Sequence, residues 1–233
     1  MACPAMSESE RVSIRQFRFS TKHPGQRPLD VRIPEVLDTD YSTFVWPSAI
    51  VLAQYIWHFR HRLPEKHILE LGAGTALPGV VASSCGAAVT LSDNADLPRC
   101  LDNCRRSCQA NGITDVRVLG LTWGDVSPDL ILLPAVDIIL GSDVFYEPKD
   151  FEKVFSTVVY LLQKSPRAEF WTTYQVRSLN WTIEPLLLKW KLQCREVPCS
   201  SFGATFPEFA GITISSTCTI RMFVITMKEK QHV

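Results

Sequence analysis

One stretch of the sequence is the strongest indication of how this chain folds, namely Ile68-Leu69-Glu70-Leu71-Gly72-Ala73-Gly74-Thr75-Ala76-Leu77-Pro78-Gly79. A short apolar run reaches an acid, then two closely spaced glycines, then a proline that suits the first turn of a helix. Glycine has no Cβ, so Gly72 and Gly74 let the backbone turn sharply and lie against a ligand. The pattern predicts a buried strand that ends where an open α/β sheet binds its ligand.

Strand and helix signals alternate after this stretch. Strands are expected at residues 68–71, 88–92, 116–121, 136–141 and 168–173, and helices at 78–85, 97–111, 151–164 and 181–190. This alternation predicts a parallel sheet that is covered on both faces. The last two predicted strands, 191–197 and 219–227, have no helix between them. We expect them to form an antiparallel pair, which makes seven strands in all.

The segment before the sheet is expected to form an extension. Residues 12–19 and 29–33 alternate between apolar and polar side chains around a turn region with two prolines, which predicts a hairpin. A strongly apolar helix is expected to open at Trp46-Pro47 and to run to Phe59. We therefore expect an extension, residues 1–40, packed on a main domain, residues 41–233.

Composition narrows the classes of function. Lys plus Arg equals Asp plus Glu at 24 each, so the chain lacks the basic excess of a protein that binds nucleic-acid phosphates. The first twenty residues lack the apolar core of a signal peptide. No stretch approaches the roughly 20 apolar residues of a spanning helix. We expect an intracellular protein without direct contacts to nucleic acid or membrane.

Three of the eight cysteines recur at helical spacing, namely Cys100, Cys104 and Cys108. They could supply thiolates to a metal, but a tetrahedral zinc site needs a fourth ligand, and no recognisable spacing offers one nearby. Free cysteine also packs as a small apolar side chain. We expect core packing for these cysteines and no metal.

Three predicted strands end on or beside acids, at the edge where open α/β sheets bind ligands. Glu70 closes the first strand, Asp93 follows the second and Asp143 follows the fourth. Asp93 lies about 20 residues after the glycine turn, the distance at which an acid accepts hydrogen bonds from ribose hydroxyls. A cofactor that contains adenosine is therefore expected.

The position of the third glycine separates the candidate cofactors. A nicotinamide site would place glycine at position 77, where this chain has Leu77. S-adenosylmethionine has a cationic amino group, which Glu70 would favour beside the loop Gly72-Ala73-Gly74. Its sulfonium and adenine suit the aromatic faces of Trp46 and Trp123. The pattern favours S-adenosylmethionine, with a nicotinamide oxidoreductase as the alternative.

The segment Gly141-Ser142-Asp143-Val144-Phe145-Tyr146-Glu147-Pro148 is expected beside the transferred methyl group. It lacks the double proline usual in enzymes that methylate nucleobase amines, which argues against a base substrate. Asp143 and Tyr146 offer an acceptor and a hydroxyl. A lysine substrate would lose its proton on burial beside the sulfonium. An arginine keeps its proton and needs a bidentate carboxylate contact, for which Asp143 with Glu147 would serve.

The chain resembles the seven-β-strand methyltransferases, and within them the family 16 group of protein methyltransferases. The similarity covers residues 41–227 and is carried by Val45-Trp46-Pro47-Ser48, Glu70-Leu71-Gly72-Ala73-Gly74, Leu91-Ser92-Asp93, Leu121-Thr122-Trp123-Gly124 and Asp143-Val144-Phe145-Tyr146. The resemblance implies a Rossmann-like sheet and assigns S-adenosylmethionine binding to Trp46, Gly72, Gly74, Asp93, Trp123 and Ser142. It places Asp143-x-x-Tyr146 at the substrate end.

The resemblance also implies a protein N-methyltransferase. It points to a histone H3 arginine methyltransferase that acts in chromatin and transcription, in nucleus and cytoplasm. Most of the family methylates lysines of non-histone proteins, chaperones included, which is the alternative. The usual arginine methyltransferases carry a double-glutamate loop and a β-barrel, and this chain shows neither. A small-molecule methyltransferase or a non-catalytic binding module also stays open.

Overall fold

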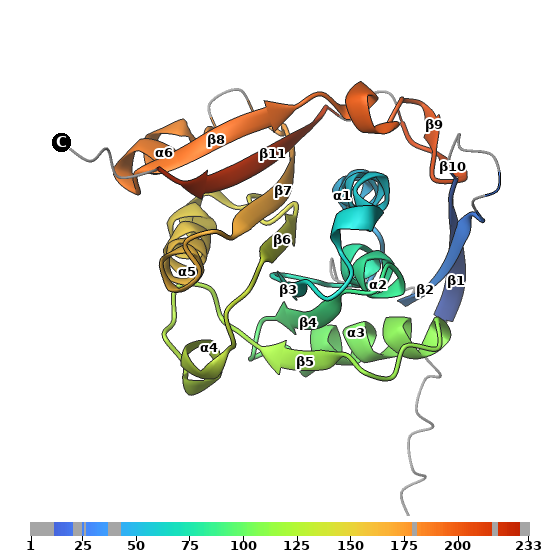
Figure 1. The fold of residues 1–233 in the computed structure, drawn as a ribbon, viewed down its shortest axis with the longest axis horizontal. Helices are drawn as coiled ribbons and strands as arrows, with labels where there is room; N and C mark the ends of the chain where they lie inside the picture. The colour runs from blue at the N-terminus through green and yellow to red at the C-terminus, as the bar shows by residue number, and fades with distance from the viewer. Residues whose placement is uncertain are drawn as a thin grey trace, which may run out of the picture.

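A computed structural model describes residues 12–20, 25, 27–36, 43–178, 181–215 and 219–228 (Figure 1). Its strands are β1 (Val12–Phe19), β2 (Leu29–Val36), β3 (His67–Glu70), β4 (Ala88–Asp93), β5 (Arg117–Gly120), β6 (Ile138–Ser142), β7 (Glu169–Gln175), β8 (Leu192–Val197), β9 (Glu208–Phe209), β10 (Ile212–Thr213) and β11 (Ile220–Met227). Its α-helices are α1 (Pro47–His58), α2 (Leu77–Ser84), α3 (Pro98–Ala110), α4 (Pro128–Leu132), α5 (Phe151–Lys164) and α6 (Glu184–Lys189). Short 3-10 helices occupy Arg60–Arg62, Pro148–Asp150 and Cys199–Phe202.

The central sheet has seven strands in the order β5-β4-β3-β6-β7-β11-β8. Strands β3 to β7 run parallel, and β11 lies antiparallel between β7 and β8. This arrangement confirms the predicted α/β sheet with a terminal antiparallel pair. Because β6 lies between β3 and β7, the carboxyl ends of these three strands meet at one edge.

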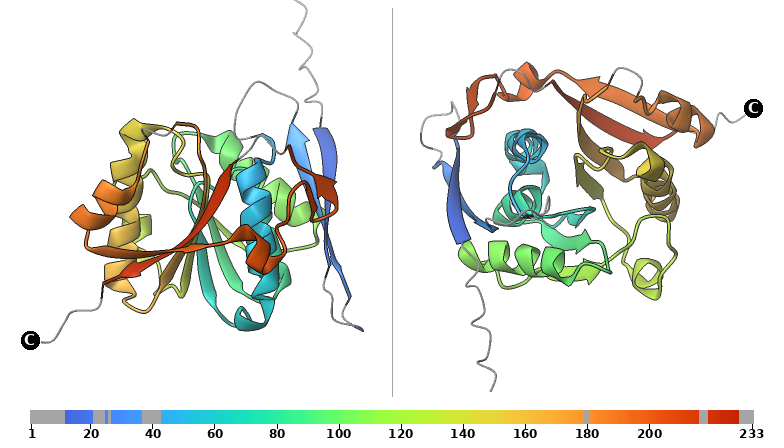
Figure 2. Two further views of the ribbon diagram at one scale, coloured as in Figure 1. Left: turned by 90° about the horizontal axis from the view of Figure 1, so that it is seen from above. Right: turned by 180° about the vertical axis from the view of Figure 1, so that it is seen from behind.

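Side chains of the strands enter two cores on opposite faces of the sheet. In β3, Ile68 packs in the core that contains α1 and α2, whereas Leu69 packs in the core that contains α5. Figure 2 shows α1, α2 and α3 on one side of the sheet and α5 and α6 on the other. Burial on both faces explains why these strands read as continuous apolar runs.

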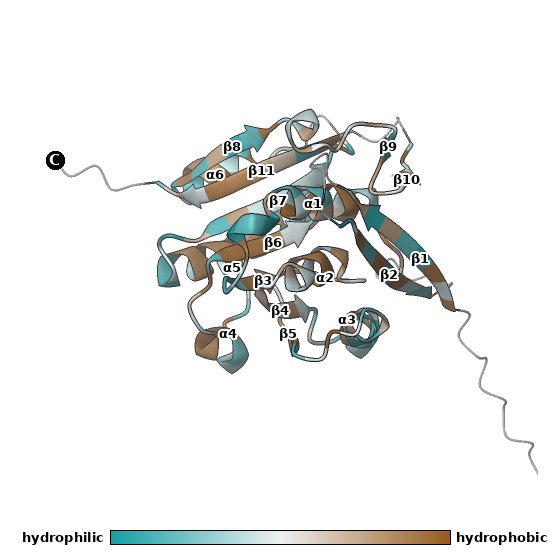
Figure 3. Cartoon of the chain, turned by 45° about the vertical axis from the view of Figure 1, so that its right-hand side comes forward, coloured by the Kyte–Doolittle hydropathy of each residue, from teal (hydrophilic) through white to brown (hydrophobic). Residues whose placement is uncertain are grey.

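Strands β1 and β2 form the predicted antiparallel hairpin, in which hydrophobic and hydrophilic residues alternate along β1 (Figure 3). The hairpin buries four side chains in the same core as α1, namely Phe17, Phe19, Val31 and Ile33. Asn111, which follows α3, accepts the N–H of Arg32 at 2.9 Å and donates to its carbonyl at 2.6 Å. The expected boundary at residues 40 and 41 lies outside the described residues.

Some elements differ from the sequence prediction. Helix α6 begins at Glu184 rather than at residue 181, and the Tyr174 hydroxyl donates to the carbonyl of Trp181 at 2.9 Å in the non-helical segment before it. Helix α4 was not predicted because five residues are too few to show a helical period. Its first turn is capped by Ser127, whose Oγ accepts the N–H of Leu130 at 3.2 Å. The two-residue strands β9 and β10 were missed for the same reason.

Cys104 and Cys108 pack in the core beneath α3, as the helical spacing predicted, and Cys100 is also buried. Burial raises the pKa of the Cys108 thiol to about 11. Within the described ranges, no three His, Cys, Asp or Glu side chains form a group that could hold a metal ion. A search of the same residues finds no helix with the length and apolar character to cross a membrane.

Candidate functional site

The loop between β3 and α2 turns at two glycines in left-handed conformation. Gly72 has φ +59° and Gly74 has φ +52°. A Cβ on Gly72 would lie 2.7 Å from the ring of Trp123, so the loop passes too close to that ring for any side chain. The N–H of Ala73 donates to the carbonyl of Ser92 at 2.9 Å. The loop is thereby fixed at the carboxyl ends of β3 and β4.

Glu70 lies behind this loop and is fully buried. One carboxyl oxygen accepts the N–H of Gly79, in the first turn of α2, at 2.8 Å, and the other has no hydrogen-bond partner. Burial raises the pKa of Glu70 to about 8, partly offset by the Gly79 N–H and reinforced by the negative charge of Asp93. The carboxyl is therefore mainly protonated at neutral pH. Sequence reasoning assigned this acid to a cofactor amino group, which stays a prediction; the carboxyl contacts the N–H of Gly79 and so joins α2 to β3.

Asp93, at the end of β4, holds the glycine loop with its carboxylate. Oδ2 accepts the N–H of Gly74 at 2.7 Å, and Oδ1 accepts the N–H of Asn94 at 2.7 Å. The side chain is only partly buried. The acid that the spacing predicted for ribose hydroxyls thus lies directly beside the second glycine.

Aromatic side chains border the same edge of the sheet. Trp123 follows β5, and its ring centroid lies 6.4 Å from that of Tyr146. Trp46 precedes α1, and its ring centroid lies 4.8 Å from that of Phe44. Tyr146 is 50% exposed and Phe44 is 36% exposed. These rings can offer flat apolar faces to a ligand at the strand ends.

Tyr146 keeps its hydroxyl proton across the neutral range. Burial raises the pKa of this phenol, and the negative charges of Asp150, Asp93 and Glu147 raise it further. The hydroxyl can therefore act as a hydrogen-bond donor. Its partial exposure leaves it accessible to a substrate.

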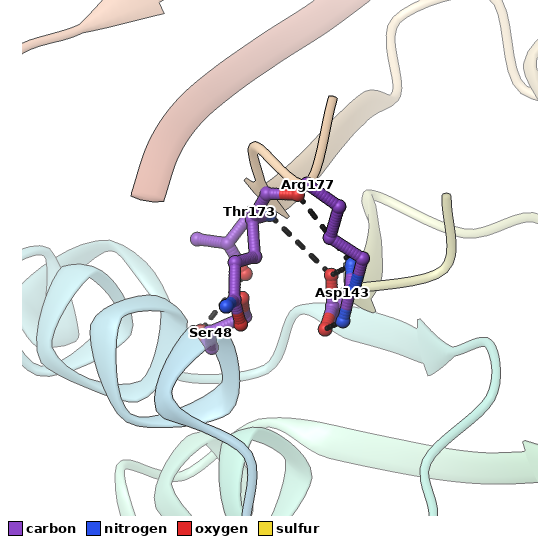
Figure 4. Close-up of polar contacts among 5 residues, drawn as sticks. Ser48, Asp143, Thr173 and Arg177 are labelled. Atoms are coloured by element: carbon purple, nitrogen blue, oxygen red, sulfur yellow. Dashed lines mark hydrogen bonds and ion pairs between the residues drawn. The ribbon is translucent and has the colours of Figure 1, made fainter. Parts of the chain in front are cut away.

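Asp143 leaves β6 in a left-handed conformation and faces a basic side chain from the segment after β7 (Figure 4). Its N–H donates to the carbonyl of Thr173 at 2.8 Å. Arg177, which follows β7, donates from Nη1 to Oδ1 at 2.8 Å and from Nη2 to Oδ2 at 2.5 Å. Sequence reasoning missed Arg177 in this site. The available signal was a basic residue just after the predicted strand 168–173.

Glu147 lies near a second basic side chain. Its side chain is 47% exposed and lies 4.0 Å from the ammonium of Lys149. The predicted pairing of Asp143 and Glu147 on a substrate guanidinium stays a prediction, whereas Arg177 of the chain itself contacts Asp143 and the carbonyl of Gln175. Ser142, the last residue of β6, is partly buried immediately before Asp143.

The first turn of α1 is joined to the end of β7 beside Asp143. The Thr173 hydroxyl donates to the carbonyl of Ser48 at 2.9 Å (Figure 4). The Ser48 hydroxyl is buried and has no hydrogen-bond partner. Trp46, at the start of α1, is thereby anchored to the same edge of the sheet as Asp93 and Asp143.

A glycine turn after the first parallel strand and a last strand inserted antiparallel beside β7 define the class I methyltransferase fold. The solved structure of a 16S rRNA N2 G1207 methyltransferase from T. thermophilus, in complex with AdoMet and guanosine, matches this fold with a TM-score of 0.61. The match has 16% sequence identity and covers 95% of this chain and 51% of that chain.

A family model described as lysine methyltransferase, methyltransferase family 16, matches residues 26–182. The histone-arginine methyltransferase METTL23 of Xenopus laevis is 52% identical over 222 residues, which cover 95% of each chain. The METTL23 of Homo sapiens is 51% identical over 186 residues, which cover 80% of this chain and 98% of that protein. The chain belongs to methyltransferase family 16, and it is an S-adenosylmethionine-dependent protein methyltransferase.

Proposed function

We propose that this protein transfers a methyl group from S-adenosylmethionine to an arginine nitrogen of a protein substrate, histone H3 first among the candidates. The observation that carries the proposal is the 52% identity, over 95% of both chains, with a relative named histone-arginine methyltransferase. The family description, lysine methyltransferase, makes lysine the alternative that an experiment has to exclude.

The described residues at the strand ends fit this cofactor. The turn at Gly72 and Gly74 brings the backbone close to Trp123, and Asp93 presents a partly buried carboxylate beside it for ribose hydroxyls. Glu70 supports the loop from behind through Gly79. The proposed cofactor-binding residues are Trp46, Glu70, Gly72, Ala73, Gly74, Asp93, Trp123 and Ser142.

S-adenosylmethionine supplies an electrophilic methyl carbon, so that the new N–C bond forms as the S–C bond breaks and S-adenosylhomocysteine leaves. Asp143 would hold the substrate guanidinium and balance its charge at the end of β6. Tyr146 would donate a hydrogen bond that aligns the guanidinium in its in-line position. Glu147, half-exposed beside Lys149, would pass the proton lost from the methylated nitrogen to water.

We further propose that the enzyme acts in chromatin and transcription, in the nucleus and the cytoplasm. The names of the relatives support a histone as substrate. The equal numbers of acidic and basic residues support recognition of a protein rather than of a nucleic-acid backbone. Fractionation of cells that express the tagged protein tests this location. The measured quantities are the amounts of the protein in the nucleus and the cytoplasm and the fraction that is bound to histones.

Methylation of recombinant histone H3, read by mass spectrometry, tests the activity. We expect the methyl group on arginine, and we expect Asp143→Asn to abolish transfer, because asparagine tolerates the left-handed backbone but cannot hold the guanidinium by charge. Asp129→Asn is the matched control, since Asp129 pairs with Arg117 on the surface. Methylation confined to lysines, in H3 or in a chaperone-containing extract, would contradict the arginine proposal.

A further inference from the structure

The Asp143 carboxylate is held in one orientation at the end of β6. The left-handed backbone of this residue has φ 56°, which aspartate tolerates better than most residues. Its N–H donates to Thr173, and the N–H of Gln175 lies 3.4 Å from Oδ1. The side chain is only 7% exposed. The two carboxylate oxygens therefore have little freedom to turn away from β7.

Arg177 contacts both of these oxygens, one with each terminal nitrogen (Figure 4). Two side-by-side N–H···O bonds match a planar guanidinium, whereas an ammonium presents a compact point charge without this fork. Asp143 thus has the geometry of a guanidinium receptor. The guanidinium that lies there belongs to the chain itself.

The two partners differ in their access to solvent. The Arg177 side chain is 25% exposed, against 7% for Asp143. Arg177 can therefore leave towards water, whereas Asp143 would stay behind as a buried charge. A buried carboxylate without a partner raises the free energy of the protein. An incoming guanidinium would restore both hydrogen bonds, but an ammonium would not restore the fork.

We propose that Arg177 occupies the position of the substrate side chain, and that a substrate arginine displaces it from Asp143. The inference rests on the proposed function and adds the group that the site accepts, a guanidinium rather than an ammonium. Because Arg177 competes with the substrate for Asp143, the apparent affinity for substrate is the intrinsic affinity multiplied by the fraction of time that Asp143 is accessible. A pair that is closed about 90% of the time weakens binding about tenfold. Arg177 thus sets how tightly the site binds its substrate, while the Asp143 carboxylate selects the guanidinium.

The test measures binding rather than methylation, which separates this inference from the proposed function. The protein, saturated with S-adenosylhomocysteine, is titrated by NMR with N-acetyl-arginine-methylamide and with its lysine counterpart. Arg177→Lys keeps the charge but not the fork, so the arginine probe should bind about tenfold more tightly than to wild type. The lysine probe should bind more weakly than the arginine probe to both proteins, because an ammonium cannot make the two side-by-side contacts with Asp143.

Arg117→Lys is the matched control. Arg117 pairs with Asp129 on the surface at the start of β5, the opposite edge of the sheet from Asp143. This change should leave the affinities for both probes as in wild type. A gain in the control equal to the gain in Arg177→Lys would contradict the proposal, because the effect would then not come from Asp143.

A second measurement uses the unmodified chain and so does not depend on the folding of a variant. The Nε–H resonance of Arg177 should move towards that of a solvent-exposed arginine as the arginine probe saturates, and stay in place with the lysine probe. The proposal is overturned if the resonance stays in place with both probes, if Arg177→Lys gains no affinity for the arginine probe, or if the lysine probe binds the variant as tightly as the arginine probe does. A failure to methylate histone arginine, with this exchange observed, would count against the proposed function alone.

Discussion

Replacing Glu70 by glutamine should stabilise the protein at alkaline pH. It should also remove a steep part of the dependence of the free energy of unfolding on pH. Glu70 is fully buried, and burial raises its pKa from 4.5 to about 8. The glutamine side chain keeps an oxygen that can accept the N–H of Gly79, but it cannot ionise. The variant should therefore retain the contact between β3 and α2 without a buried negative charge.

The size of the effect follows from the two pKa values. The folded chain keeps the Glu70 proton up to about pH 8, whereas the unfolded chain releases it near pH 4.5. Between these values the folded state binds more protons, so the free energy of unfolding falls as pH rises. The contribution of Glu70 to the free energy of unfolding is complete below pH 4.5 and is lost as the pH rises through 8. At about 1.4 kcal/mol per pH unit, the whole interval corresponds to roughly 5 kcal/mol.

Urea denaturation of wild type and Glu70→Gln between pH 5 and pH 9 measures this contribution. Groups common to both proteins cancel in the difference between the two free energies of unfolding, which should grow in favour of the variant as pH rises. Glu65→Gln makes the same chemical change at an exposed side chain and serves as the control. A flat difference for Glu70→Gln, or a variant that is less stable than wild type at pH 9, would show that Glu70 does not have a raised pKa in the folded chain.

Three further changes probe the site and its support. Asp93→Asn should weaken S-adenosylhomocysteine binding about tenfold or more in calorimetry, since hydrogen bonds to a charged group contribute about 1.5–3 kcal/mol; an unchanged affinity would remove the ribose assignment. Tyr146→Phe should lower kcat about three- to tenfold through loss of one hydrogen bond, and full turnover would end that role. Gly79→Ala should destabilise the fold by about 1–3 kcal/mol in urea, because its Cβ would overlap Leu91 and Glu70. Wild-type stability would contradict this packing.

The parallel core was predictable because each strand is buried on both faces and so appears as an apolar run between helix signals. The burial of Glu70 also follows from the alternation of side chains along its strand. Leu69 and Leu71 enter one core, and side chains alternate along a strand, so Glu70 must enter the other. An acid in that position has to be paired or protonated.

The pairing of Asp143 with Arg177 was beyond sequence reasoning for a different reason. The two residues are 34 positions apart and meet only because β6 and β7 are neighbours in the sheet. The spacing placed Asp143 at a strand end but gave no orientation for the side chains around it. Glu147 is near Asp143 in sequence, yet its side chain lies by Lys149.

A crystal structure of the protein with S-adenosylhomocysteine would show whether the ends of β3, β4 and β6 bind the cofactor. We expect the ribose hydroxyls within hydrogen-bond distance of the Asp93 carboxylate and the sulfur facing Asp143 and Tyr146. A ligand bound at another place on the chain, with the Gly72–Gly74 turn out of contact with it, would contradict the account.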